Sequence, residues 1–295
     1  MNDPRSVPMH PCRKAVLSTL VAALLVPTSL LAASANAAVP DHSLWERFLQ
    51  QHVRAGRVDY AAVKRNPSGL DRYLEGLAKT RRREFYEASK NTRLAFWINA
   101  YNAYTIQLVV AHYPVTSIWD VTPVWKRPLG GPFVEEFIPL GHLFPGKPLA
   151  RKLSLNDIEH EILRKEFHEP RVHFTIVCAS RSCPTLNTHA YRAATLEHQL
   201  TAAARAFMRD ASKNRYDATS NTLYLSEIFR WFGQDFQRDG SLIGFLRPYL
   251  DDGTLLRLSQ VKTAPRIEFN SYDWSLNKQT ETAQQKTASE RQTHG

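Results

Sequence analysis

Two cysteines that bracket a short loop are the residues best suited to chemistry in this sequence. The loop runs from Cys178 to Pro184 and follows a stretch of β-branched residues. Rigid scaffolds often present reactive groups at such places. Three interpretations stay open: a disulfide that closes the loop, a thiol nucleophile, or two inert apolar side chains.

A nucleophilic cysteine needs a setting that stabilises its thiolate. Arg181 precedes Cys183 by two residues, and the Ser180-Arg181-Ser182 run before Cys183 and Pro184 after it favour an extended loop. We therefore predict that Cys183 is the more accessible thiol and the nucleophile. Cys178 would be the more buried one, because it ends a predicted strand. In the disulfide interpretation, the same two residues form the bond.

A nucleophilic thiol also needs a base. His173 lies five residues before Cys178, and in a regular strand this spacing places the two side chains on opposite faces. His142, His189 and His112 are freer to approach the loop. Of these we take His142, in a segment rich in proline and glycine, as the candidate catalytic base.

Two asparagines on the most apolar predicted helix form a second candidate site. Asn99 and Asn102 are three residues apart and therefore share a helix face. Asn102 lies on the apolar stripe, which predicts a buried and hydrogen-bonded amide. That amide either holds neighbouring backbone in place or orients a catalytic group. Asn102 is thus a catalytic candidate, and Asn99 and Arg181 are candidates for ligand binding.

Acid–base groups are sparse. Glu159 and Glu161 flank His160 on a predicted helix, and Asp235 follows an aromatic one. The sequence has no H-E-x-x-H, no closely spaced Cys/His quartet and no acidic calcium loop, so no metal site is predicted. It has no Walker loop and no G-x-G-x-x-G, so no cofactor is predicted. The absence of G-x-S-x-G excludes the α/β-hydrolase elbow.

Composition sets the class of protein. The chain has 295 residues, of which 43% are hydrophobic and 22% charged, and this balance excludes collagen-like, coiled-coil and wholly disordered chains. Three cysteines exclude a disulfide-dense miniprotein. The net charge of +10 favours an anionic partner. The ligand that we expect in a cleft of this protein is anionic or peptide-like. The basic runs are scattered, which argues against specific nucleic-acid binding.

The first 37 residues are typical of a cleavable signal peptide. A basic leader precedes an apolar run over residues 15–33, and Ala35-Asn36-Ala37 follows as a small-x-small cleavage site. We therefore expect a periplasmic or secreted protein that begins at Ala38 and has no stable membrane span after cleavage. The mature chain keeps a net charge of +8 and two cysteines, Cys178 and Cys183, in an oxidising compartment.

Periodicity predicts a helix-rich single domain of the α+β class with a small sheet over residues 38–276. The strongest helix spans Thr92–His112, and a capping box of Ser154 and Asp157 begins another. Residues 114–150 form a long irregular segment, which is expected to be functional or a lid. The predicted strands are residues 133–138, 171–178, 215–216, 223–225 and 266–274. Residues 277–295 are predicted to be a disordered polar tail.

Three blocks of residues resemble a known family. They are Phe96–Ala103, the segment from Val172 through Cys178 to Pro184, and Tyr272–Asn277. Their types and order resemble the bacterial branch of the family called domain of unknown function 547. The resemblance implies an exported bacterial protein with one such domain, and it implies no particular activity.

Two functions remain open. In the first, a thiol-dependent or ligand-processing enzyme has a cleft between the apolar helix, the 114–150 segment and the Cys178–Cys183 loop. In the second, a non-catalytic envelope module binds a partner, and the two cysteines form a structural disulfide. A base close to either sulfur would favour the enzyme.

Overall fold

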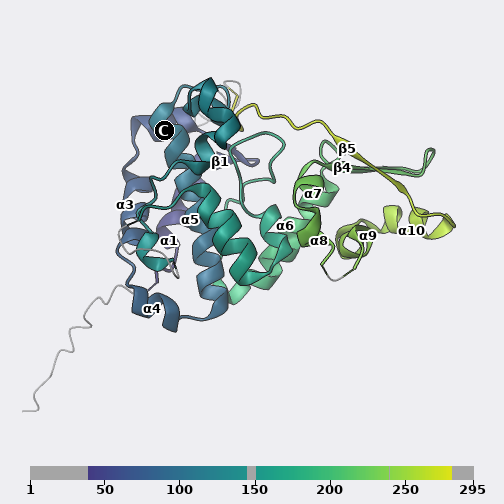
Figure 1. Cartoon of the computed structure of the whole chain (residues 1–295), viewed down its shortest axis with the longest axis horizontal. Coiled ribbons are helices and arrows are strands. Elements are labelled where there is room, and N and C mark those ends of the chain that lie inside the picture. Colours follow the sequence, from purple (N-terminus) through teal and green to yellow (C-terminus); the bar gives the residue numbers. More distant parts are fainter. Residues whose placement is uncertain (1–38, 145–150, 239, 281–295) are drawn as a thin grey trace, which may run out of the picture. The chain divides into compact units, whose positions relative to one another are not determined.

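The structure is a computed structural model that describes residues 39–144, 151–238 and 240–280. The predicted signal peptide lies outside these ranges, and so does the chain from residue 281 onward. Within them, a helix-rich α+β domain with two small sheets confirms the predicted fold class (Figure 1). No helix in the described part of the chain is both long and apolar enough to cross a bilayer.

The first half contains four short helices and the long helix α5 (Lys90–His112), which share one hydrophobic core. Ser89 caps α5 by accepting a hydrogen bond from the Thr92 amide. Nearly every residue between Leu94 and Val109 is buried, so α5 is the centre of the larger hydrophobic core. The surrounding elements are α1 (Ser43–His52), β1 (Val53–Arg54), β2 (Arg57–Val58), α2 (Tyr60–Arg65), α3 (Ser68–Ala78) and α4 (Arg82–Glu87).

The irregular segment after α5 is built from tight helical turns. These are η1 (Ile118–Val121), η2 (Val124–Leu129), η3 (Gly131–Val134) and η4 (Gly141–Leu143). The strand predicted at residues 133–138 is wrong, because only Ile138 pairs, in a single bridge with Leu153. Gly131 has φ +56°, and a Cβ there would lie 2.5 Å from the Trp119 ring. A glycine is therefore required for Trp119 to pack at this turn.

The predicted capping box is confirmed. The Ser154 hydroxyl accepts from the Asp157 amide at 3.0 Å, and the Asp157 carboxylate accepts from the Ser154 amide at 2.9 Å. This pair begins η5 (Asp157–Phe167), which is wound as a π-helix. Such wide turns are rare and are often found at functional sites. Here the helix carries Glu159 and His160.

The strand predicted at residues 171–178 is wrong. Residues Pro170–Phe174 form the short helix η6, and the next residues are extended without a neighbouring strand. The Asn102 amide takes the place of that strand: it donates to the Thr175 carbonyl at 2.9 Å and accepts from the Val177 amide at 2.8 Å. The β-branched run is buried against helices instead of in a sheet.

The second half has its own hydrophobic cluster around a three-stranded sheet. β3 (Arg215–Asp217) pairs antiparallel with β4 (Thr222–Ser226), as the predicted hairpin requires, and β4 pairs parallel with β5 (Arg266–Asn270). The helices are η7 (Ala193–Thr195), α6 (Leu196–Arg209), α7 (Ile228–Trp231), α8 (Gly233–Phe236), α9 (Leu242–Leu246), η8 (Arg247–Tyr249) and α10 (Asp252–Gln260).

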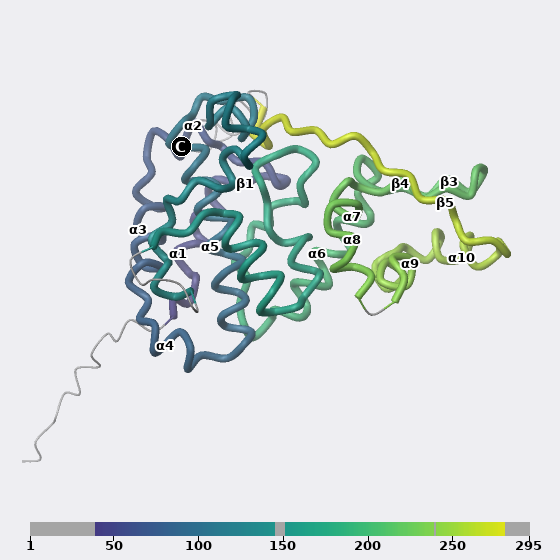
Figure 2. Tube along the Cα trace, in the orientation of Figure 1, coloured from purple at the N-terminus to yellow at the C-terminus, as the bar shows by residue number. Residues whose placement is uncertain are grey.

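After β5 the chain runs back to the first half of the domain (Figure 2). Asp273 accepts from the Ser182 amide, Leu276 bridges to Ser180, and Lys278 bridges to Val58. The returning segment thus covers the cysteine loop. Since Asn277 is buried, the chain stays packed beyond the predicted start of the polar tail.

Candidate functional site

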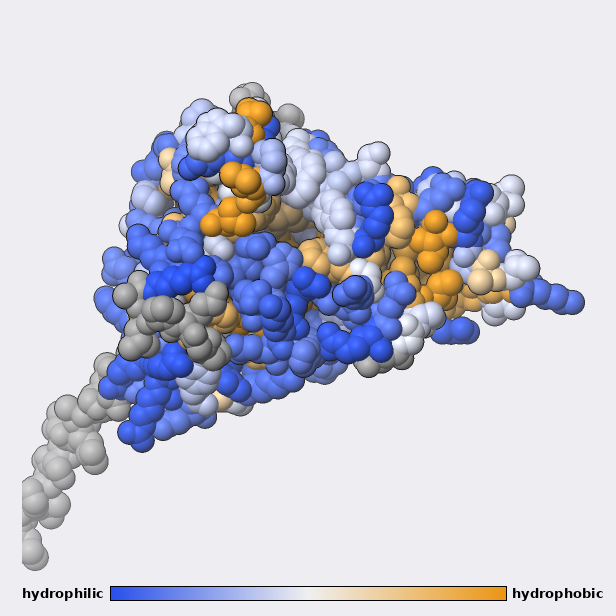
Figure 3. Space-filling view, viewed as in Figure 1, coloured by the Kyte–Doolittle hydropathy of each residue, from blue (hydrophilic) through white to orange (hydrophobic). Residues whose placement is uncertain are grey.

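A cleft of about 280 Å³ lies where the sequence placed one, between α5, the irregular segment and the cysteine loop. The molecular face in Figure 3 is hollowed, and apolar surface shows inside the hollow. The cleft is lined by Tyr101, Trp119, Gly130, Phe133, Asn156, Glu159, His160, His173, Ile176, Cys178, Cys183, Pro184, Ile228, Trp231, Phe232, Tyr272 and Trp274. No lysine or arginine is among these lining residues.

One wall of the cleft is a continuous set of aromatic rings. Trp274 is its centre, with ring centroids 5.3 Å from Trp119, 5.8 Å from Trp231 and 4.6 Å from Tyr272. Phe133 extends the wall at 5.4 Å from Trp119. Trp231 keeps 43% of its surface exposed. Such a wall binds planar or apolar groups by stacking and by burial of area.

Glu159 is the carboxyl group of the cleft. The Tyr101 hydroxyl donates to its Oε2 at 3.1 Å. Burial raises the pKa of Glu159 from 4.5 to about 7, although the Tyr101 hydrogen bond and the Arg164 charge oppose this shift. Within residues 39–144, 151–238 and 240–280, no cation pairs with it at 4.0 Å or less. Glu159 therefore changes its protonation state near neutral pH.

A network of polar and charged groups adjoins the cleft, and two of its members, His160 and His173, line it. Arg164 donates to Asp235 at 2.6 Å and to His160 Nδ1 at 2.8 Å. The buried His173 donates from Nε2 to Asp235 at 2.8 Å and stacks on Phe232 at 4.0 Å.

The pKa values of both histidines of this network are lowered. Burial and the Arg164 charge lower the pKa of His160 to about 4. Burial also lowers the pKa of His173, although Asp235 opposes this shift. The hydrogen bonds from His173 and Arg164 hold the pKa of Asp235 far below its usual range, against the effect of burial. Asp235 is thus a fixed anion, and Glu159 is the cleft group that titrates near neutrality.

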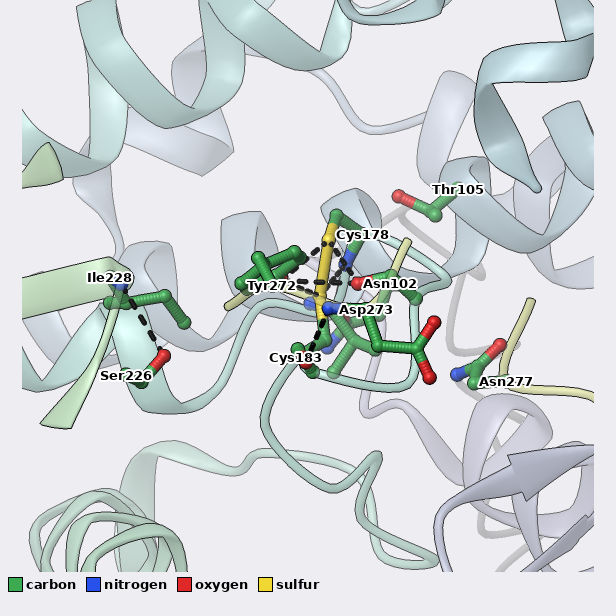
Figure 4. The surroundings of a disulfide bond; sticks show 12 residues. Asn102, Thr105, Cys178, Cys183, Ser226, Ile228, Tyr272, Asp273 and Asn277 are labelled. Atoms are coloured by element: carbon green, nitrogen blue, oxygen red, sulfur yellow. Dashed lines mark hydrogen bonds between the residues drawn. A yellow bond between two sulfur atoms is a disulfide. The ribbon is translucent and has the colours of Figure 1, made fainter. Parts of the chain in front are cut away.

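The two cysteines form a disulfide with Cα atoms 6.3 Å apart, which settles their redox state in this structure (Figure 4). Cys183 Sγ accepts from the Cys178 amide at 2.9 Å and from the Tyr272 hydroxyl at 3.2 Å. Cys183 is only 4% exposed, whereas Cys178 is half-buried, so the predicted order of burial is wrong. The reason is that the returning segment around Asp273 covers Cys183, while Cys178 does not end a strand.

The two candidate asparagines hold segments of the backbone in place through hydrogen bonds. Asn102 is buried, as predicted, and holds the residues that lead into Cys178 through the two hydrogen bonds described above. Asn99 does the same for Tyr191, donating to its carbonyl at 2.8 Å and accepting from its amide at 3.0 Å. Both amides are buried and hydrogen-bonded to backbone, and neither lines the cleft, so they position the site.

His142 and Arg181 do not line the aromatic cleft. His142 lies on η4, where its Nε2 is 2.9 Å from the Thr80 carbonyl and its own carbonyl accepts from Arg82. No hydrogen bond joins a histidine ring to either sulfur in the described residues. Arg181 lines a second, polar cavity of about 430 Å³ on the other side of the cysteine loop.

Sequence reasoning missed the aromatic wall. Trp119 and Trp231 lie on short helices and Trp274 lies on an irregular stretch, where no periodicity marks them, and they come from three distant segments. Glu159 was noticed only as one member of a sparse acid–base set. The sequence signal that could have identified Glu159 is its position as a charged residue on the apolar side of a capped helix.

Comparison with known proteins gives one match. Residues 85–208 match the family model described as protein of unknown function, DUF547, which agrees with the resemblance seen in the sequence. The match includes α5, Glu159 and both cysteines, while Trp231 and Trp274 lie beyond it. No curated protein and no solved structure matches the chain.

Proposed function

We propose that this protein is an exported ligand-processing domain in which Glu159 transfers a proton to or from a ligand bound in the aromatic cleft. One observation carries the proposal: a carboxyl group whose pKa is about 7 lines a cleft walled by aromatic rings. General acid–base catalysis is most efficient when the pKa of the group lies near the working pH. The N-terminal pattern over residues 1–37 supports export.

The lining of the cleft supports a planar, weakly charged group as the part of the ligand that enters it. The five rings of the aromatic wall offer stacking faces, and the lining contains no lysine or arginine. The anionic ligand expected from net charge would therefore find no cation here. A ligand that also carries an anionic group would have to place it outside the aromatic cleft.

The number of carboxyl groups in the cleft indicates the class of reaction. Glycoside hydrolysis uses two carboxyl groups on either side of the bond that breaks. Glu159 is the single carboxylate among the described lining residues, since Asp235 is held behind the cleft by His173 and Arg164. One carboxylate in an apolar pocket suits removal of a proton from carbon or oxygen, as in an isomerisation or an elimination.

The ring opening of 5-nitrobenzisoxazole tests this chemistry without knowledge of the natural ligand. A base removes the proton on the ring carbon, the N–O bond breaks, and a coloured cyanophenolate is released. We expect catalysis that rises with pH through a midpoint of about 7, the pKa of Glu159. Glu159→Gln should slow it about a hundredfold or more, the usual contribution of a positioned base.

Glu161→Gln is the matched control, because Glu161 lies on the same helix and pairs with Lys165 at 2.8 Å instead of entering the cleft. Its rate should equal that of the wild type. Equal rates in Glu159→Gln and the wild type would contradict the proposal.

The disulfide favours a second candidate, a non-catalytic envelope module that binds through the same cleft. Cys178 and Cys183 are bonded to each other, and no histidine of the described residues is hydrogen-bonded to either sulfur. A structural disulfide needs no such base. In that case the planar probe would bind, Trp231→Ala would weaken its binding, and neither the wild type nor Glu159→Gln would convert it. Conversion that depends on Glu159 separates the enzyme from the module.

A further inference from the structure

We propose that the Cys178–Cys183 disulfide is a thiol-exchange site that is entered from the aromatic cleft, with Cys178 as the attacked sulfur and Cys183 as the leaving one. This inference goes beyond proton transfer by Glu159 and does not depend on it. It reverses the roles that the sequence predicted for the two cysteines.

The two cysteine residues differ in exposure. Both cysteines line the cleft, but Cys178 is half-buried and Cys183 is 4% exposed. Cys183 is covered by the returning segment, where the neighbouring Ser182 amide donates to the Asp273 carbonyl. An attacking thiol that enters the cleft therefore meets Cys178 first.

The two sulfurs also differ in how well they can leave. Cys183 Sγ accepts from the Cys178 amide at 2.9 Å and from the Tyr272 hydroxyl at 3.2 Å. Ser180 donates to that same hydroxyl at 3.1 Å, which leaves the Tyr272 proton free to point at sulfur. The Tyr272 and Ser180 hydroxyls also lie 3.4 Å and 3.2 Å from Cys178 Sγ, so the donor that distinguishes the two sulfurs is the Cys178 amide, which donates to Cys183 Sγ. Hydrogen bonds from an amide and a phenol stabilise a thiolate, and a stabilised thiolate leaves faster in exchange.

The step balances without an additional oxidant. A ligand thiolate attacks Cys178 Sγ and forms a mixed disulfide with it. The Cys178–Cys183 bond breaks, and its electron pair stays on Cys183 as a thiolate held by the two donors. A second thiolate can then attack the mixed disulfide at the ligand sulfur, which releases a ligand disulfide and leaves both cysteines reduced.

The test uses 2-mercaptoethanol as the thiol, with the purified protein quenched in acid and mapped by mass spectrometry. We expect the adduct on Cys178 and an alkylatable thiol on Cys183. An adduct on Cys183, or equal adducts on both cysteines, would overturn the assignment. So would an intact disulfide at thiol concentrations that fully reduce oxidised glutathione, because the bond would then be a staple alone.

A conservative pair of variants tests the leaving group. Tyr272→Phe keeps the ring in the aromatic wall and removes the hydroxyl that donates to Cys183. Loss of a hydrogen bond to a charged group should slow exchange about tenfold. Tyr104→Phe is the control, since Tyr104 is buried beside Phe137 and should leave the exchange rate unchanged. Equal rates in Tyr272→Phe and the wild type would contradict the role of the hydroxyl.

Discussion

Replacement of Glu159 by glutamine should make the protein more stable at neutral pH and change little at acidic pH. The pKa of Glu159 is raised from 4.5 to about 7 in the folded protein, mainly by burial. Between these two values the folded chain keeps a proton that the unfolded chain has lost. The free energy of unfolding of the wild type therefore falls as pH rises through this window.

The size of the effect follows from the two pKa values. A shift of one pKa unit corresponds to about 1.36 kcal/mol, so the raised pKa lowers the free energy of unfolding by about 2 kcal/mol at pH 6 and about 3 kcal/mol at pH 8, relative to a carboxyl with the ordinary pKa. Part of the Glu159 surface is open to the cleft, and water there screens the charge, so these values are upper limits. Glutamine has no charge to bury and keeps the shape of the side chain.

The assay is urea unfolding of both proteins between pH 4 and pH 8, followed by circular dichroism. We expect the difference in free energy of unfolding, variant minus wild type, to rise by about 2–3 kcal/mol across the range. Glu161→Gln is the control, because Glu161 is 39% exposed and pairs with Lys165, so its difference should not rise. A difference for Glu159→Gln that stays flat with pH would refute the reasoning.

Three further predictions concern the rest of the site. Asn102→Ala should lower the free energy of unfolding by about 2–4 kcal/mol, because it leaves two buried backbone groups unsatisfied. Asn99→Ala should have the same effect for the same reason. Urea unfolding measures the loss in both variants. Replacing Cys178 and Cys183 together by serine should cost about 2 kcal/mol, the chain-entropy value for so short a loop, and a loss above 5 kcal/mol would contradict it. N-terminal sequencing of the processed protein should begin at Ala38, and an intact N-terminus on all of the protein would reject export by cleavage.

Local signals predicted those parts of the fold that depend on neighbouring residues. The capping box of Ser154 and Asp157 and the apolar run that becomes α5 are satisfied within a few residues, so their positions were correct. The strand at residues 171–178 was wrong because its backbone partner is the side chain of Asn102, about 70 residues earlier. The periodicity of apolar residues along a segment does not indicate a contact with a side chain so far away in sequence.

The sequence pointed to the segments that surround the cleft, but it did not predict the chemistry of the cleft. The cleft lies between the three predicted segments, yet its wall comes from Trp119, Trp231 and Trp274, which meet only in the fold. The chemistry of Glu159 depends on that burial and on Tyr101, so no local pattern reveals it. The predicted order of burial of the two cysteines was wrong for the same reason, because a segment distant in sequence covers Cys183.

The pKa of the Glu159 carboxyl, measured directly, tests the central claim. Glutamate labelled with carbon-13 at the side-chain carboxyl gives one NMR signal per residue, and the signal missing from Glu159→Gln identifies this group. We predict that it titrates with a midpoint of about 7, far from the ordinary value of 4.5. A midpoint near 4.5 would show an ordinary solvated carboxylate and would contradict proton transfer by Glu159 in the aromatic cleft.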